Sequence, residues 1–153
     1  MCASKDDYKP GFLRSLLANK CPRCRRGDLY LNKNPYELKK MMKMPENCPV
    51  CGQPFELEVG FYYGTGFVSY ALAVLFCVAS FILWKLLIGM SLDDHRIFWW
   101  IGVNAVLLLV LQPVLMRMSR TIWLWFFVYY DPEWSVRPAG APERTNEEQK
   151  KNW

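Results

Sequence analysis

The fold is decided by residues 67–88, which read FVSYALAVLFCVASFILWKLLI, and by residues 97–116, which read IFWWIGVNAVLLLVLQPVLM. A helix rises about 1.5 Å per residue, so the two stretches would extend about 33 Å and about 30 Å, close to the hydrocarbon thickness of a bilayer. A buried hairpin in a soluble protein is the alternative, but the rest of the chain has too few apolar segments to cover two such helices. We therefore expect a membrane protein with a two-helix antiparallel transmembrane hairpin over residues 66–116.

Small side chains mark the face on which the first helix would pack against the second. They recur at spacings of three or four residues, at Ser69, Ala73, Cys77 and Ser80. Small residues allow two membrane helices to approach closely, and a polar side chain can hydrogen-bond across the interface. Asn104 in the second stretch is the candidate for that bond, with a transport path as the alternative. Gln112-Pro113 predicts a kink near the end of the second helix.

The positive charges are distributed unevenly around the hairpin. Of the 19 Lys and Arg residues, eleven lie in residues 1–65, two (Lys85 and Arg96) lie beside the joining loop, and six follow residue 116. Basic residues near the ends of spanning segments are retained on the cytoplasmic side. Residues 1–20 also lack the apolar core of a secretory signal peptide. We predict a two-pass protein with both termini in the cytoplasm.

The chain changes character after residue 116. Residues 121–130 hold six aromatic side chains and follow Arg117 and Arg120. Ten helical residues cover about 15 Å and cannot cross a bilayer, so we predict that residues 117–131 form an interfacial aromatic segment among the lipid headgroups. A groove for a partner protein is the alternative. Pro, Glu, Lys and Asn dominate residues 132–153, where we predict a flexible cytoplasmic tail.

Four of the six cysteines form two Cys-x-x-Cys pairs that are separated by 23 residues: Cys21 with Cys24, and Cys48 with Cys51. Two such pairs supply the tetrahedral sulfur set that zinc prefers. Gly52 suits the turn that closes a metal knuckle, whereas Arg25 holds the matching position after the first pair. Disulfides rarely persist in a reducing cytoplasm, and no βαβ pattern accompanies a redox dithiol. The sequence predicts structural Zn²⁺ bound by these four cysteines.

The zinc ion would stabilise a cytoplasmic module over residues 1–65, which contains too little apolar material to fold easily without a staple. Alternation with polar residues predicts short strands after each pair, at Leu29 and Leu31, then at Phe55, Leu57 and Val59. Asn34-Pro35 predicts the start of a helix that ends at Met44. Its methionines are typical of core packing, with copper handling as the alternative. We expect a zinc-ribbon-like module with short strands and one inserted helix.

Residues 58–66 join the module to the first apolar stretch. Gly60, Gly64 and Gly66 allow close backbone approach, and the aromatic residues 61–63 can anchor among the headgroups. We interpret this segment as a structural elbow, with a ligand site as the alternative.

Four basic residues surround the first pair of cysteines: Lys20, Arg23, Arg25 and Arg26. Close to a membrane these charges would be attracted to anionic lipid headgroups, and each could contribute up to about 1 kcal/mol of binding free energy. Contact with a partner protein ranks second. Nucleic acid binding, which zinc ribbons with basic patches can perform, ranks third.

The motifs of a known family stand between residues 34 and 72. Residues 34–36 read NPY, residues 48–53 read CPVCGQ, residues 58–64 read EVGFYYG and residues 68–72 read VSYAL. Together with Cys21, Cys24 and the two following helices, over about residues 12–131, the chain resembles the bacterial membrane-protein family catalogued as Domain of Unknown Function 983, particularly its Bacteroidetes-type members. The resemblance implies a bacterial inner-membrane location and no established activity. Some members are encoded beside cytochrome oxidase genes.

Two functions from different classes follow. The first is a non-enzymatic adapter or assembly factor for a membrane complex, with respiratory oxidase biogenesis suggested only by the resemblance. The second is a metal- or thiol-handling protein that uses the two cysteine pairs. We do not expect an enzyme, because the one histidine, His95, lies in the outer loop apart from the cysteines. The expected partners are the lipid bilayer and a membrane-protein complex, and a second copy of the chain is a further candidate.

Overall fold

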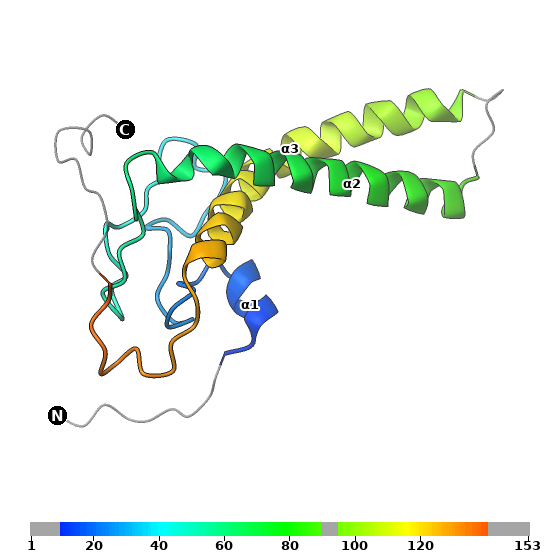
Figure 1. The fold of residues 1–153 in the computed structure, drawn as a ribbon. Coiled ribbons are helices and arrows are strands. Elements are labelled where there is room, and N and C mark those ends of the chain that lie inside the picture. Colours follow the sequence, from blue (N-terminus) through cyan, green and yellow to red (C-terminus); the bar gives the residue numbers. More distant parts are fainter. Residues whose placement is uncertain (1–9, 90–94, 141–153) are drawn as a thin grey trace.

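The computed structural model describes residues 10–89 and 95–140. Along the chain these residues form α1 (Phe12–Leu17), the 3-10 turn η1 (Phe61–Gly64), α2 (Thr65–Leu87) and α3 (Arg96–Phe127). Figure 1 shows α2 and α3 projecting together, as an antiparallel pair, from a globular region that the rest of the chain builds. We refer to that region, residues 10–65 with residues 117–140, as the module.

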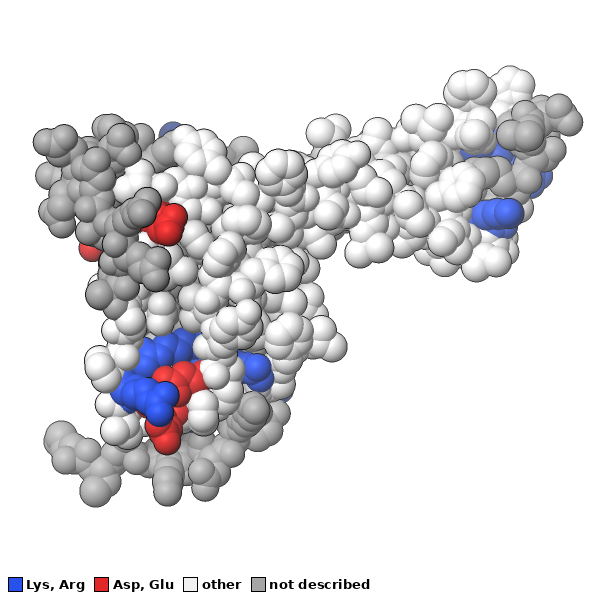
Figure 2. Space-filling model, viewed as in Figure 1, with Lys and Arg blue, Asp and Glu red and all other residues white. Residues whose placement is uncertain are grey.

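The two projecting helices are long and apolar enough to cross a membrane, with mean hydropathies of 2.3 and 1.9 in their most apolar windows. Many of their large apolar side chains are exposed, among them Phe67, Leu86 and Leu109 at 76–81%. Figure 2 shows this part of the surface free of charge except near its far tip. The left-handed Gly89 (φ 77°), whose N–H donates to the Lys85 carbonyl, stops α2. The predicted hairpin helices are therefore present, with starts close to residues 67 and 97.

The predicted packing face joins the two helices. Asn104 is 8% exposed and accepts a hydrogen bond of 2.8 Å from the Ser80 hydroxyl. Its amide donates to the Cys77 sulfur over 3.3 Å. Phe81 and Trp100 meet edge to face with ring centroids 5.4 Å apart. Asn104 thus links α3 to the small-residue stripe of α2 through Ser80 and Cys77.

The second helix does not end where the sequence predicted. α3 is one helix of 32 residues that passes through Pro113 and continues to Phe127. It changes direction along its length (Figure 1), in keeping with the predicted proline kink. The prediction of a separate element from residue 117 is therefore wrong. After residue 116 the helix loses its apolar character because this part of α3 belongs to the module, where four of its side chains are buried: Arg117, Ser119, Thr121 and Leu124.

The helix predicted from Asn34 to Met44 is absent, and this part of the described chain is a series of turns. The side chain of Asn34 does accept the predicted N-terminal hydrogen bond, from the Tyr36 N–H. Its carbonyl, however, accepts from the guanidinium of Arg117 at 2.9 Å, where a helix would need the N–H of Leu38. A tertiary contact therefore overrides the local helix signal.

Strands were predicted after each cysteine pair, and none is formed in the described ranges 10–89 and 95–140. Isolated antiparallel bridges, Lys20 with Asp28 and Asn47 with Pro54, close the two knuckles in their place. Of the residues assigned to strands, Leu29 and Phe55 are buried in the core, whereas Leu31 is 68% exposed. The ribbon-like part of the predicted fold is thus reduced to single bridges.

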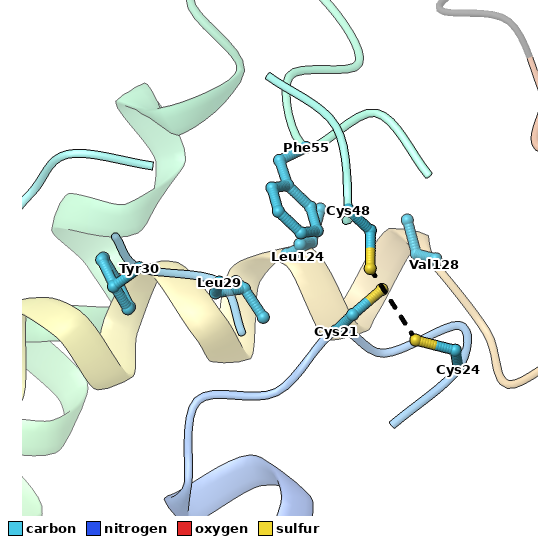
Figure 3. Close-up of a cluster of buried hydrophobic side chains, with 8 residues drawn as sticks. All are labelled: Cys21, Cys24, Leu29, Tyr30, Cys48, Phe55, Leu124 and Val128. Atoms are coloured by element: carbon cyan, nitrogen blue, oxygen red, sulfur yellow. Dashed lines mark hydrogen bonds between the residues drawn. The ribbon is translucent and has the colours of Figure 1, made fainter. Parts of the chain in front are cut away.

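The core of the module draws on both ends of the chain (Figure 3). It contains three cysteines with Leu29, Tyr30 and Phe55 from the N-terminal part, and Leu124 and Val128 from the end of α3 and the residue after it. The module therefore extends beyond the predicted boundary at residue 65. Residues 1–9 of the predicted module and residues 141–153 of the predicted tail lie outside the described residues.

Candidate metal centre

Two matching backbone turns carry the cysteine pairs. The N–H of Arg25 donates to the Cys21 carbonyl at 2.8 Å, and the N–H of Gly52 donates to the Cys48 carbonyl at 2.9 Å. Both donors have a left-handed backbone, with φ of 57° for Arg25 and 70° for Gly52. Glycine adopts this conformation freely, and other residues adopt it at a cost. The first knuckle thus has the same turn as the second, built on an arginine.

The side chain of Arg25 gains contacts that offset this cost. Its guanidinium lies over the ring of Tyr130, 4.5 Å from the centroid, and near Trp125 at 5.4 Å. It also donates to the carbonyl of Pro10 at 3.1 Å. Cation–π contacts contribute about 0.5–2 kcal/mol each. An arginine at this position therefore ties the first knuckle to α3 and to Pro10, just before α1.

Gly27, three residues after Cys24, has a steric role. A Cβ at this position would lie 2.3 Å from the sulfur of Cys48, closer than any real contact. The N–H of Gly27 also points at the sulfur of Cys24, at 3.5 Å. The absence of a side chain allows the two knuckles to close on each other.

The structure brings the four predicted cysteines together. Their sulfur atoms all lie within 4.8 Å of one another, and both Cys21–Cys51 and Cys24–Cys48 have sulfurs 3.8 Å apart. A tetrahedral ion with metal–sulfur distances of about 2.3 Å would hold its ligand sulfurs about 3.8 Å apart. A disulfide would need about 2.05 Å, and all four cysteines are free thiols. The donor set therefore fits a metal ion.

Burial of the four cysteines makes it costly for their thiols to ionise together. Cys21, Cys24 and Cys48 are 0–3% exposed, and Cys51 is half-buried. Contacts with the other three thiols, together with burial, raise the pKa of Cys21. A hydrogen bond with Cys21 lowers the pKa of Cys24, and the same kind of bond lowers the pKa of Cys48 to about 7. Four thiolates could share this space only if a cation compensated their charge, so a bound metal ion would take the place of the thiol protons.

Apolar side chains and one buried arginine enclose the cluster. Figure 3 shows Leu124 and Val128 of the α3 end beside the thiols. Arg23, 5% exposed, donates to the Cys51 carbonyl at 3.4 Å and to the Asp131 carboxylate at 3.2 Å. The pKa of Asp131 is lowered, first by the N–H of Glu133 and then by Arg23. Arg23 therefore holds the chain after α3 against both knuckles.

The basic residues around the first knuckle are engaged within the molecule. Lys20 pairs with Asp28 at 2.5 Å, Arg23 and Arg25 make the contacts described above, and Arg26 lies over the ring of Trp134. Their part in lipid contact stays a prediction. Sequence reasoning missed the supporting roles of Arg117 and Asp131, because their partners lie more than 70 residues away along the chain. An arginine directly after an apolar run, followed by aromatic residues, was the available signal.

The fold and the site together define a class: a protein with two helices able to span a membrane and a module built on a four-cysteine cluster. The model of the family described as "Protein of unknown function (DUF983)" matches residues 38–124, more than half of the chain, and the protein belongs to this family. The predicted family is thereby confirmed, and the resemblance to its Bacteroidetes-type members stays a prediction. A search of curated proteins and a search of solved structures found no match.

Proposed function

We propose that this protein is a non-enzymatic adapter or assembly factor for a membrane complex, in which a structural zinc ion stabilises a platform on the cytoplasmic side of a bacterial inner membrane. One observation carries the proposal. The thiols lie in the core of the module, and α3 runs without a break from the hairpin into that same core. The platform and the hairpin are therefore joined through one continuous helix, which suits a protein that presents a surface to a larger complex.

The choice of zinc follows from the donor set. Four thiolates in a tetrahedron are the preferred environment of structural Zn²⁺. Cys21, Cys24, Cys48 and Cys51 would fill all four positions, leaving none for a substrate. Such an ion contributes folding free energy and no chemistry. The respiratory oxidase remains the candidate complex on the family resemblance alone.

The contacts across the hairpin support the proposed topology. Thr121 donates to the Asn19 side chain at 2.6 Å, and Tyr30 donates to the Arg117 carbonyl at 2.9 Å. These bonds join residues before the hairpin to residues after it, which supports placing both flanks on one side of the membrane. The excess of Lys and Arg on these flanks favours the cytoplasmic side.

Elemental analysis of the purified full-length protein tests the zinc ion. We expect one zinc per chain, and loss of both zinc and thermal stability in Cys48→Ser. Cys77→Ser is the matched control, because Cys77 is a free cysteine of α2 outside the cluster. A zinc content near zero in the wild type, or equal zinc in both variants, would contradict the proposal.

Cross-linking in native membranes tests the adapter role. We expect the full-length protein to be recovered in defined higher-mass species, with the same species after mild detergent extraction. A fold-defective Cys48→Ser variant should lose them. Recovery of an isolated monomer throughout would sink the adapter proposal while leaving the zinc site intact.

A metal- or thiol-handling role is the second candidate, and the position of Cys51 favours it. This residue is only half-buried, so one ligand of the cluster is open to exchange. In that case a chelator should remove the ion from the native protein within minutes, and maleimide should label Cys51 first. An ion and thiols that resist both reagents would exclude this role and favour the structural one.

A further inference from the structure

A cavity of about 760 Å³ lies in the module beside the start of α2. One wall comes from the segment before α2, with Gly60, Tyr62 and Tyr63, and Arg120 of α3 closes another side. The loop of residues 38–46 supplies most of the rest. Cavities of about 300–1,000 Å³ are the usual size of small-molecule sites. The space is therefore large enough for a lipid headgroup and the first part of its chains.

The cavity lies where the hairpin leaves its apolar section. Tyr63 is two residues before the first residue of α2, and its side chain is 75% exposed. Arg120 lies about one helical turn beyond Met116, the last residue of the second apolar run. In the membrane placement proposed above, both walls therefore stand at the level of the lipid headgroups. Aromatic and basic residues are the side chains that favour this level.

The lining combines apolar and charged side chains. The apolar members are Leu31, Leu38, Met42, Met44, Phe55 and Tyr63. The cations are Lys39, Lys43 and Arg120, and the carboxylates are Glu46 and Glu56. Three positive and two negative groups leave an excess of one positive charge. A ligand with a phosphate and an apolar part complements such a lining.

Arg120 is prepared to receive a phosphate. Its guanidinium lies 5.0 Å from the centroid of the Tyr62 ring, and the Tyr62 hydroxyl donates to the Phe55 carbonyl at 2.7 Å, which fixes the ring. Among the described residues the Arg120 side chain has no hydrogen bond or ion pair, whereas three donors of the Arg117 side chain go to carbonyls. The planar guanidinium binds phosphate through paired N–H groups. Arg120 is thus a positioned cation whose donors are available.

We propose that this cavity binds one acidic phospholipid, with the headgroup phosphate at Arg120, Lys39 and Lys43 and the glycerol end of the chains along Met42 and Tyr63. Basic pockets at the ends of membrane helices are known to bind anionic headgroups. The inference rests on the membrane location in the proposed function. It differs from general attraction to an anionic surface because it requires one lipid per chain at a defined place.

Native mass spectrometry of the full-length, delipidated protein in a neutral detergent tests the site. Phosphatidylglycerol and phosphatidylcholine with the same acyl chains are added separately. We expect one phosphatidylglycerol per chain, bound at least tenfold more tightly than phosphatidylcholine. Arg120→Gln should abolish this preference, and the double variant Lys39→Gln/Lys43→Gln should reduce it severalfold. The double variant Lys33→Gln/Lys40→Gln removes the same charge from exposed positions outside the cavity and should retain the preference.

Several results would overturn the site. They are equal affinity for the two lipids, equal loss in both lysine double variants, or equally effective competition by soluble glycerol phosphate, which would indicate a free phosphate ligand. Zinc content and thermal midpoint report whether each variant folds, and the exposed Lys39 and Lys43 keep the test valid if Arg120→Gln does not fold. The assay requires neither a partner protein nor a particular orientation of the protein in a membrane. Its failure is therefore distinguishable from failure of the adapter role, which cross-linking measures.

Discussion

Arg117 is the side chain whose removal should most clearly release the loop of residues 33–41 from α3. It is 4% exposed, and its three nitrogens donate to the carbonyls of Met41 at 2.8 Å, Asn34 at 2.9 Å and Lys33 at 3.2 Å. No carboxylate is among these partners. Arg117→Met keeps a long side chain and removes every donor, so the loop of residues 33–41 loses its attachment to α3.

The free-energy cost of Arg117→Met is the energy of the lost hydrogen bonds, reduced by the cost of burying a cation that the variant avoids. Hydrogen bonds to a charged group are worth about 1.5–3 kcal/mol each, so three of them amount to about 6 kcal/mol. Several kcal/mol are recovered, because the variant no longer has to bury a cation. The cation–π contact with Tyr30, 4.8 Å from the ring centroid, adds about 1 kcal/mol to the loss. A net loss of about 3 kcal/mol corresponds to a roughly hundredfold increase in loop opening.

Hydrogen exchange of the detergent-solubilised protein measures that opening. The amide of Leu31, bonded to the Lys43 carbonyl at 3.1 Å, reports on the loop directly. Exchange there should accelerate roughly a hundredfold in Arg117→Met, and by less in Arg117→Lys, which keeps the charge without the planar fork. Exchange in α2 should not change. The exposed ion-pair variant Arg137→Gln is the control. An acceleration below about threefold in Arg117→Met, with zinc retained, would refute the view that this guanidinium holds the loop.

Three further outcomes are expected. Gly64→Ala places a Cβ 2.1 Å from the Trp123 ring and should destabilise the module by about 1–3 kcal/mol, measured as a lower temperature of zinc release. Gly66→Ala is the control, because a Cβ there meets open space, and it should leave that temperature unchanged. Asn104→Leu removes both polar contacts between α2 and α3 and should lower the midpoint of denaturation by dodecyl sulfate, at about 0.6–1.7 kcal/mol per bond; an unchanged midpoint would contradict the interhelical role. Burial raises the pKa of Tyr30 from 10.0 to about 12, so its neutral form contributes roughly 3 kcal/mol that is present below pH 10 and lost as the pH rises to about 12. Tyr30→Phe should flatten this alkaline loss in a stability titration, and an identical titration curve would argue against it.

The cysteine cluster shows which features of a site can be predicted from local sequence patterns. A Cys-x-x-Cys turn is defined by four consecutive residues, so both turns could be predicted from the sequence. The left-handed Gly52 followed from its position in the same way, and Arg25 adopts the matching turn. The clearance that Gly27 provides for Cys48 could not be predicted, because the two residues meet only when the knuckles close.

The loop of residues 34–44 shows where prediction from local sequence fails. Asn34 and Pro35 are sound helix-start residues, and the Asn34 side chain makes the expected bond to the Tyr36 N–H. The helix does not form, and the Asn34 carbonyl, which a helix would use, instead accepts a hydrogen bond from Arg117, 83 positions further along the chain. Propensity is a weak prior, and one buried guanidinium is enough to override it.

Composition and spacing within short stretches were enough to predict the two long apolar helices, their small-residue contact face with Asn104, and the four thiols. Three features emerge only in the folded chain: α3 continues to Phe127, its end completes the core around the thiols, and residues before and after the hairpin form one module. Residues 117–127 combine polar and apolar side chains, so their composition suits a membrane interface and a protein core alike. Contacts with residues more than 60 positions earlier in the chain decide between these two environments.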